Sequence, residues 1–100
     1  MTAPLKAADI PPGTMKVVDA GGVRVAVCNV EGTYYAVEDV CTHDDGPLGE
    51  GSLRGSELEC PRHGARFCVK SGAALRMPAV VPVRVFPVTL VDGSVVVEVP

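Results

Sequence analysis

Two short segments constrain this chain more than any other feature, because each places a cysteine beside a histidine. The first is Cys41–His43 and the second is Cys60–Gly64, which reads Cys-Pro-Arg-His-Gly. The chain has 100 residues and only two histidines, His43 and His63, and both belong to these segments. Thiolate sulfur and imidazole nitrogen are common ligands of transition metals. A fold for this sequence must therefore bring two loops together at one metal centre.

The ligand types favour an iron–sulfur cluster over a zinc ion. A Cys-x-His loop paired with a Cys-x-x-His loop is the ligand pattern of a Rieske [2Fe–2S] cluster, in which two histidines replace two cysteines. Two neutral imidazoles remove the negative charge of two thiolates, so the potential rises from about −400 mV to roughly −150 to +300 mV. A Cys2His2 zinc site in a structural zinc module is the alternative interpretation. Zinc fingers, however, usually pair like with like and place the histidines on a helix, and no ten-residue window here has a helical pattern.

The remaining sequence predicts an all-β fold. Val23, Val25 and Val27 alternate with polar or small residues, as in half-buried strands, and glycine-containing turn signals separate such runs. The predicted strands are 15–19, 23–30, 34–38, 58–60, 65–69, 83–91 and 94–99. Pro87 interrupts the sixth and predicts a bulge or an edge. We expect one domain over 1–100, an antiparallel β-sandwich or small barrel with a cluster-binding subdomain inserted at about 39–78.

Composition narrows the possible partners and locations. The net charge is −3, which does not favour nucleic acid or an acidic membrane as a partner. No run approaches 18 apolar residues, and residues 1–10 do not resemble a signal peptide. We therefore expect a cytoplasmic protein without a membrane anchor, and a monomer in solution.

The motifs resemble those of Rieske-type ferredoxins, the small soluble electron carriers of multicomponent non-haem iron oxygenases. The resemblance runs nearly end to end, through these stretches: Asp9–Gly13, Tyr35–Asp39, Cys41–Leu48, Cys60–Phe67 and Met77–Ala79. It implies that Cys41 and Cys60 hold the inner iron of one [2Fe–2S] cluster, that His43 and His63 hold the outer iron, and that Met77–Ala79 belongs to a third loop over the cluster.

The resemblance also implies a function without catalysis by the chain itself. A carrier of this kind passes single electrons from an NAD(P)H-dependent flavin reductase to a terminal oxygenase. The chain is too short to hold a catalytic iron domain as well. Electron donation in another pathway, such as nitrite reduction or iron–sulfur cluster assembly, is the alternative, because the ligand motif is compatible with each.

Departures from the respiratory Rieske pattern predict a potential at the low end of the range. Gly46 and Arg62 occupy the positions of two cysteines that form a disulfide in respiratory proteins, and Ala65 replaces a serine that donates to a bridging sulfide. Fewer donors to sulfur stabilise the reduced cluster less.

Two further groups of residues, apart from the four ligands, also lead to predictions. Cys28 and Cys68 lie in strand-like surroundings, which predicts small packing residues. The charged residues near the loops predict a solvated rim, with a docking surface as the alternative: Asp39, Asp44, Asp45, Glu50, Arg62 and Arg66.

Overall fold

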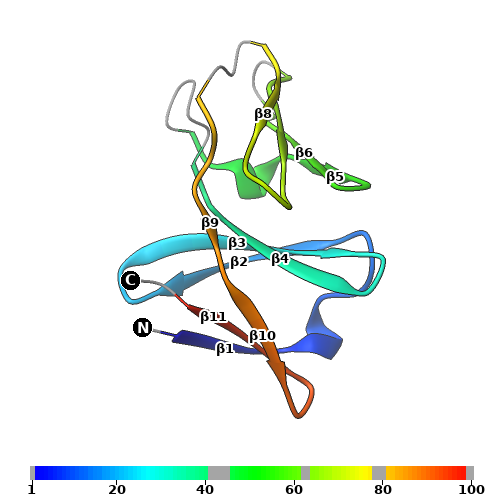
Figure 1. The fold of residues 1–100 in the computed structure, drawn as a ribbon, viewed down its shortest axis with the longest axis vertical. Helices are drawn as coiled ribbons and strands as arrows, with labels where there is room; N and C mark the ends of the chain where they lie inside the picture. The colour runs from blue at the N-terminus through cyan, green and yellow to red at the C-terminus, as the bar shows by residue number, and fades with distance from the viewer. Residues whose placement is uncertain (1, 41–45, 62–63, 78–80, 99–100) are drawn as a thin grey trace.

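The computed structural model describes residues 2–40, 46–61, 64–77 and 81–98, and within them the chain forms three antiparallel sheets (Figure 1). The base sheet has the order β1–β11–β10, from Thr2–Lys6, Ser94–Glu98 and Val88–Val91. The central sheet has the order β2–β3–β4–β9, from Met15–Ala20, Val23–Val30, Thr33–Glu38 and Val85–Phe86. The small sheet has the order β5–β6–β7–β8, from Ser52–Arg54, Glu57–Glu59, Arg66–Cys68 and Ala74–Arg76.

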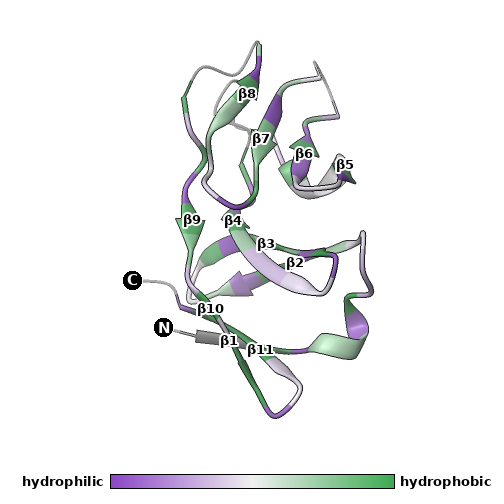
Figure 2. Ribbon diagram, turned by 45° about the vertical axis from the view of Figure 1, so that its right-hand side comes forward, coloured by the Kyte–Doolittle hydropathy of each residue, from purple (hydrophilic) through white to green (hydrophobic). Residues whose placement is uncertain are grey.

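The three sheets are arranged along the longest axis of the molecule. Figures 1 and 2, seen from two directions, place the small sheet at one end and the base sheet at the other, with the central sheet between them. Two short 3-10 turns join the sheets, η1 at Ala7–Asp9 and η2 at Leu48–Glu50. None of the described segments forms a helix long and apolar enough to cross a membrane.

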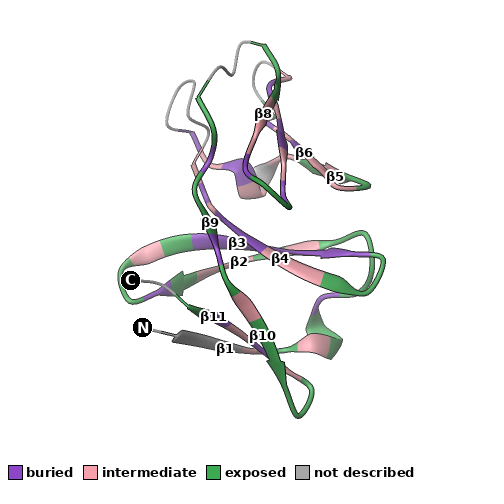
Figure 3. Ribbon diagram, viewed as in Figure 1, coloured by how far each residue is buried: buried purple, intermediate pink, exposed green. Residues whose placement is uncertain are grey.

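Strand β3 is buried on both faces, because it lies between two hydrophobic cores (Figure 3). Ala26 and Cys28 belong to the core that the central sheet shares with the small sheet. Val25 and Val27 belong to the core shared with the base sheet. The predicted half-buried character of this strand is therefore wrong from Val25 onward, although the predicted alternation of faces is confirmed.

Pro87 divides the predicted strand 83–91 into two strands that serve different sheets. Before it, Val85 and Phe86 pair with β4. After it, Val88–Val91 pairs with β11, and the Glu98 N–H donates to the Pro87 carbonyl at 3.0 Å. Proline has no N–H to give to a ladder, so it suits the corner at which a strand leaves one sheet for another.

The antiparallel all-β class predicted from the sequence is confirmed, but the element list was incomplete. The predicted strands match β2, β3, β4, β6, β7, β9 with β10, and β11 to within a few residues. Three further strands, β1, β5 and β8, had no clear signal. Two of these have three residues each, too short to show an alternation.

Candidate functional site

Of the four predicted cluster ligands, Cys60 lies within the described residues, whereas Cys41, His43 and His63 lie outside them. Cys60 follows β6, is 2% exposed and forms no disulfide. It belongs to a core that also contains Leu48 and Ala65. Leu48 follows the first ligand motif in the sequence, and Ala65 follows the second. A buried, unpaired thiol beside a tight turn has the chemistry of a structural or cluster ligand.

The second motif forms the turn that the sequence predicts. The Cys60 N–H donates to the Ala65 carbonyl at 2.7 Å, and the Gly64 N–H donates to the Cys60 carbonyl at 3.3 Å. Gly64 has a φ of 73°, in the left-handed region that glycine adopts without steric cost. Below this turn, Glu59 of β6 pairs directly with Arg66 of β7. The turn is thus fixed at its base by a regular hairpin.

The first motif is held by a buried carboxylate at its entrance. The side chain of Asp39 is 1% exposed; its Oδ2 accepts from Arg24 Nε at 3.2 Å, and its Oδ1 accepts from the Gly49 N–H at 2.6 Å. Asp39 precedes segment 41–45 and Gly49 follows it, so one carboxylate ties the two ends of this loop together. The prediction that Asp39 belongs to a solvated rim is therefore wrong.

The two loops are joined through a close backbone contact. Gly51 lies so near the Glu59 carbonyl that a Cβ on residue 51 would overlap that oxygen. Next to it, Ser52 pairs with Glu59. The chain that leaves the first motif therefore runs against the residue that precedes Cys60. The flanks of both predicted ligand loops meet at the end of β6, as a shared metal centre requires.

Arg66 is also not a solvated rim residue, because it takes part in a charged network on the outer face of the small sheet. Its Nη1 lies 3.5 Å from Glu57 Oε1, and its Nη2 lies 3.8 Å from Glu59 Oε1. Arg54 Nε lies 3.3 Å from the same oxygen of Glu59. Sequence patterns gave no signal for Glu57 and Glu59. The other rim residues, Asp44, Asp45, Arg62 and the side chain of Glu50, lie outside the described part.

The two remaining cysteines have different roles in the structure. Cys28 is fully buried, and burial raises the pKa of its thiol to about 12. Cys68 is partly exposed. Burial acts to raise the pKa of Cys68, but the Ser71 hydroxyl, the backbone N–H groups of Ser71 and Lys70, and the Lys70 charge together lower it. The packing role predicted for both is confirmed for Cys28 and wrong for Cys68.

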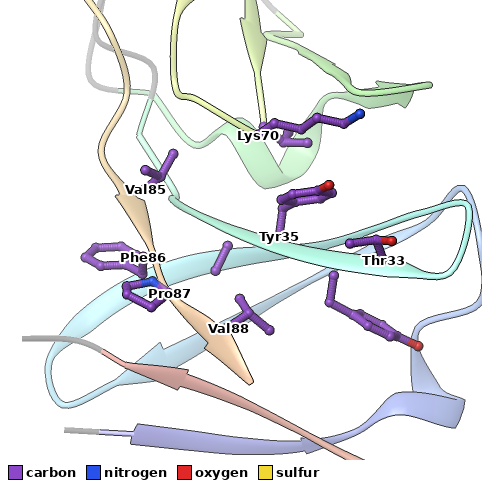
Figure 4. A pocket seen from close by; sticks show the side chains of 10 residues that line it. Thr33, Tyr35, Lys70, Val85, Phe86, Pro87 and Val88 are labelled. Atoms are coloured by element: carbon purple, nitrogen blue, oxygen red, sulfur yellow. The ribbon is translucent and has the colours of Figure 1, made fainter. Parts of the chain in front are cut away.

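A pocket of about 530 Å³ lies at the edge of the central sheet, where β9 turns toward the base sheet (Figure 4). Its lining comes from Thr33–Ala36, Val69–Lys70 and Val85–Val88. Among these lining residues, Lys70 alone is charged. The Tyr34 hydroxyl donates to the Ala7 carbonyl at 3.0 Å and so has a structural role. The pocket offers no pair of groups suited to acid–base or nucleophilic chemistry.

The described residues fit the cluster that the motifs imply. Cys60 supplies a buried free thiol, and backbone hydrogen bonds to Gly64 and Ala65 close the segment that follows it. Leu48 and Ala65 belong to the same buried core as Cys60. Cysteine sulfur with histidine nitrogen is the donor set of a Rieske cluster.

Comparison with known proteins agrees with this site. A family model described as "Rieske [2Fe-2S] domain" matches residues 2–87. The ferredoxin component of biphenyl 2,3-dioxygenase from Rhodococcus jostii (strain RHA1) is 42% identical, with 90% of this chain and 84% of that protein covered.

Two solved structures resemble the fold closely. The Sphingomonas yanoikuyae B1 ferredoxin has a TM-score of 0.89 and 33% identity, covering 95% of this chain and 94% of that one. A chain in the complex of reduced oxygenase and oxidized ferredoxin in carbazole 1,9a-dioxygenase has a TM-score of 0.88 and 42% identity, covering 94% and 91%. Motifs, fold and relatives agree, and this chain belongs to the Rieske [2Fe-2S] domain family.

Proposed function

We propose that this protein is a one-electron carrier of an aromatic-ring dioxygenase system. One Rieske cluster would be held by Cys41, His43, Cys60 and His63, and would accept and release a single electron. The observation that carries the proposal is the meeting of the two loops beside Cys60: Asp39 with Gly49 closes the first loop, and Gly51 lies against Glu59, the residue before Cys60. The chain itself then binds and insulates the cluster and presents it to other proteins.

The proposed partners follow from the relatives. One relative compared above is named as the ferredoxin component of a dioxygenase, and one resembling chain is in a complex of oxygenase with ferredoxin. We infer a terminal oxygenase as the electron acceptor and an NAD(P)H-dependent flavin reductase as the donor. We further infer a monomeric, cytoplasmic protein. In this role the chain turns over no organic substrate by itself.

Ala65 supports a low potential for the cluster. It is fully buried beside Cys60, and its methyl group cannot donate a hydrogen bond to sulfur. The reduced cluster gains less stabilisation than it would with a hydroxyl donor there. We expect a midpoint potential of roughly −150 mV, at the low end of the Rieske range.

Metal and sulfide analysis of the purified protein tests the proposal. We expect about two irons and two acid-labile sulfides per chain, and a brown protein whose reduced form has a Rieske-type EPR spectrum. Cys60→Ser should lose the cluster, whereas Cys28→Ala should keep it as a matched control. One zinc ion without sulfide would refute the electron-carrier function in favour of a structural zinc module. A midpoint potential well above zero would refute the assignment to the oxygenase ferredoxins.

A further inference from the structure

The outer face of the small sheet carries a compact set of charges beside the second ligand turn. Side chains alternate across a strand, so those facing outward are the neighbours of the residues that pack into the core. Leu58 and Phe67 face the core. The outward-facing charged residues of β5, β6 and β7 are Arg54, Glu57, Glu59 and Arg66, and the exposed Arg76 of β8 lies opposite Arg66 in the register. The two positive and two negative side chains of β5 to β7 balance, and Arg76 of β8 adds one positive charge beside Arg66.

Glu59 and Arg66 are the members of this set that lie against the ligand turn. They form the cross-strand pair directly below it, before the hydrogen bond from Cys60 to Ala65. Glu59 Oε2 also lies 3.6 Å from the position that a Cβ on Gly64 would occupy. The Glu59 carboxylate therefore belongs to the residue before Cys60 and lies near Gly64, the residue after His63.

The surroundings of Glu59 and Arg66 reduce the screening of their charges by water. The side chains of Arg66 and Glu59 are 28% and 23% exposed, so protein replaces much of the water that would screen them. Within the described ranges, Arg66 Nε is buried and has no hydrogen-bond acceptor. A guanidinium that loses water without gaining an acceptor there interacts more strongly with charges nearby.

We propose that Glu59 and Arg66 are positioning residues for the second ligand turn, and that their charges shift the reduction potential of the cluster in opposite directions. The inference rests on the proposed ligands Cys60 and His63. Reduction adds one negative charge to the site. A carboxylate next to the turn opposes that step, and a guanidinium favours it. The balanced pair holds the turn with little net effect, whereas either charge alone would shift the potential.

Three neutralising variants of the cluster-loaded protein test the proposal by voltammetry at pH 7. Glu59→Gln should raise the midpoint potential and Arg66→Gln should lower it. Each shift should correspond to at least a threefold change in the equilibrium constant for reduction, on a scale where tenfold is about 59 mV for one electron. The double variant should return near the wild-type potential. Loss of packing alone would not produce shifts of opposite sign that cancel.

Matched controls separate this effect from general changes in charge. Glu57→Gln removes the same charge from the same strand, two residues farther from Cys60 than Glu59, and should shift the potential less. Glu98→Gln, in the base sheet, should leave it unchanged. If Arg66→Gln does not fold, Arg66→Lys decides, because it keeps the charge and should keep the wild-type potential.

The outcomes that refute this inference differ from those that refute the proposed function. Equal shifts from Glu57→Gln and Glu59→Gln, shifts of the same sign from Glu59→Gln and Arg66→Gln, or no shift would overturn the role of the pair while the cluster remains. Wild-type protein without iron and sulfide would instead overturn the proposed ligands.

Discussion

The side chains of Cys28 and Cys68 lie in opposite environments, although both occur in strands. Cys28 is enclosed by the core between the central and small sheets, and its thiol has a pKa of about 12. Cys68 lies on the outer face of β7, where polar groups of the following turn lower the pKa of its thiol. Thiolate is the reactive form of cysteine, so reactivity should differ strongly between the two positions.

We predict that iodoacetamide modifies Cys68 in the folded, cluster-loaded protein at pH 8, well before it modifies Cys28. A lower pKa provides more thiolate at this pH, and partial exposure provides access. Peptide mapping by mass spectrometry measures both rates, and Cys68→Ser is the control that should remove the fast reaction. Equal labelling of the two cysteines in folded protein would contradict the prediction.

Asp39 links three parts of the chain through one buried carboxylate, as its contacts with Arg24 and Gly49 show. We predict that Asp39→Ala lowers the free energy of unfolding by about 1–3 kcal/mol, because the Gly49 N–H loses its acceptor. Asp39→Asn keeps an acceptor oxygen and should cost less. Urea denaturation measures the difference, and iron content reports on the adjacent loop. If both variants unfold like wild type, the carboxylate does not hold this loop.

At the scale of elements, the turn between β7 and β8 is fastened to the segment that leads into β9. The Val83 N–H donates to the Gly72 carbonyl at 2.8 Å, and Gly72 itself has a φ of 82°. A Cβ on residue 72 would overlap the Val83 carbonyl oxygen and approach the Val85 side chain. Glycine is therefore required here by both the backbone conformation and the close approach.

We predict that Gly72→Ala destabilises the protein by about 3–5 kcal/mol, because it combines backbone strain with a clash against main chain. Gly93→Ala is the matched control. Gly93 has a φ of 78°, but nothing lies within 4 Å of its Cβ position, so the cost should be about 1–2 kcal/mol of strain. Thermal unfolding of both variants measures the difference. Similar melting temperatures would contradict the importance of the contact with Val83.

The elements and ligand loops that the sequence predicted are those with a local pattern. Valine alternation marked β3, and the Cys-Pro-Arg-His-Gly motif marked the turn that Cys60 begins. The short strands β5 and β8 have three residues each and are stabilised mainly by their neighbours, so nothing local revealed them. The same holds for the burial of Asp39 and for the pairing of Glu59 with Arg66. The contacts of Asp39 join residues 10 to 15 positions apart. The predicted hairpin places Glu59 near Arg66, but a pattern of residue types does not show which charged side chains meet across it.

At the scale of the whole molecule, β3 connects the two cores. Its successive side chains enter the core beneath the small sheet and the core above the base sheet in turn. A perturbation of either core therefore acts on the same strand. This arrangement is compatible with the prediction of one domain over 1–100 with a cluster-binding subdomain at about 39–78. We further expect that this subdomain does not unfold by itself.

We predict a single cooperative unfolding transition for the cluster-loaded protein. Leu58→Ala, beneath the small sheet, should cost about 2–5 kcal/mol. It should shift the loss of visible absorbance and the loss of far-UV circular dichroism together, because both report one transition. Val97→Ala, in the base core, is the counterpart and should also move both signals. Two separate transitions, with only the visible one shifted by Leu58→Ala, would show an independent subdomain.

The pairing of β1 with β11 has a practical consequence for studying this protein on surfaces. Thr2 lies opposite Glu98, in the base sheet, at the end of a molecule 39 Å long that is remote from the small sheet (Figure 1). An affinity tag on either strand would attach the protein to an electrode through the base sheet, the end remote from the predicted cluster. Because tunnelling weakens steeply with distance, a current should be obtained more readily when the molecule is anchored the other way round, through an engineered group on the small sheet.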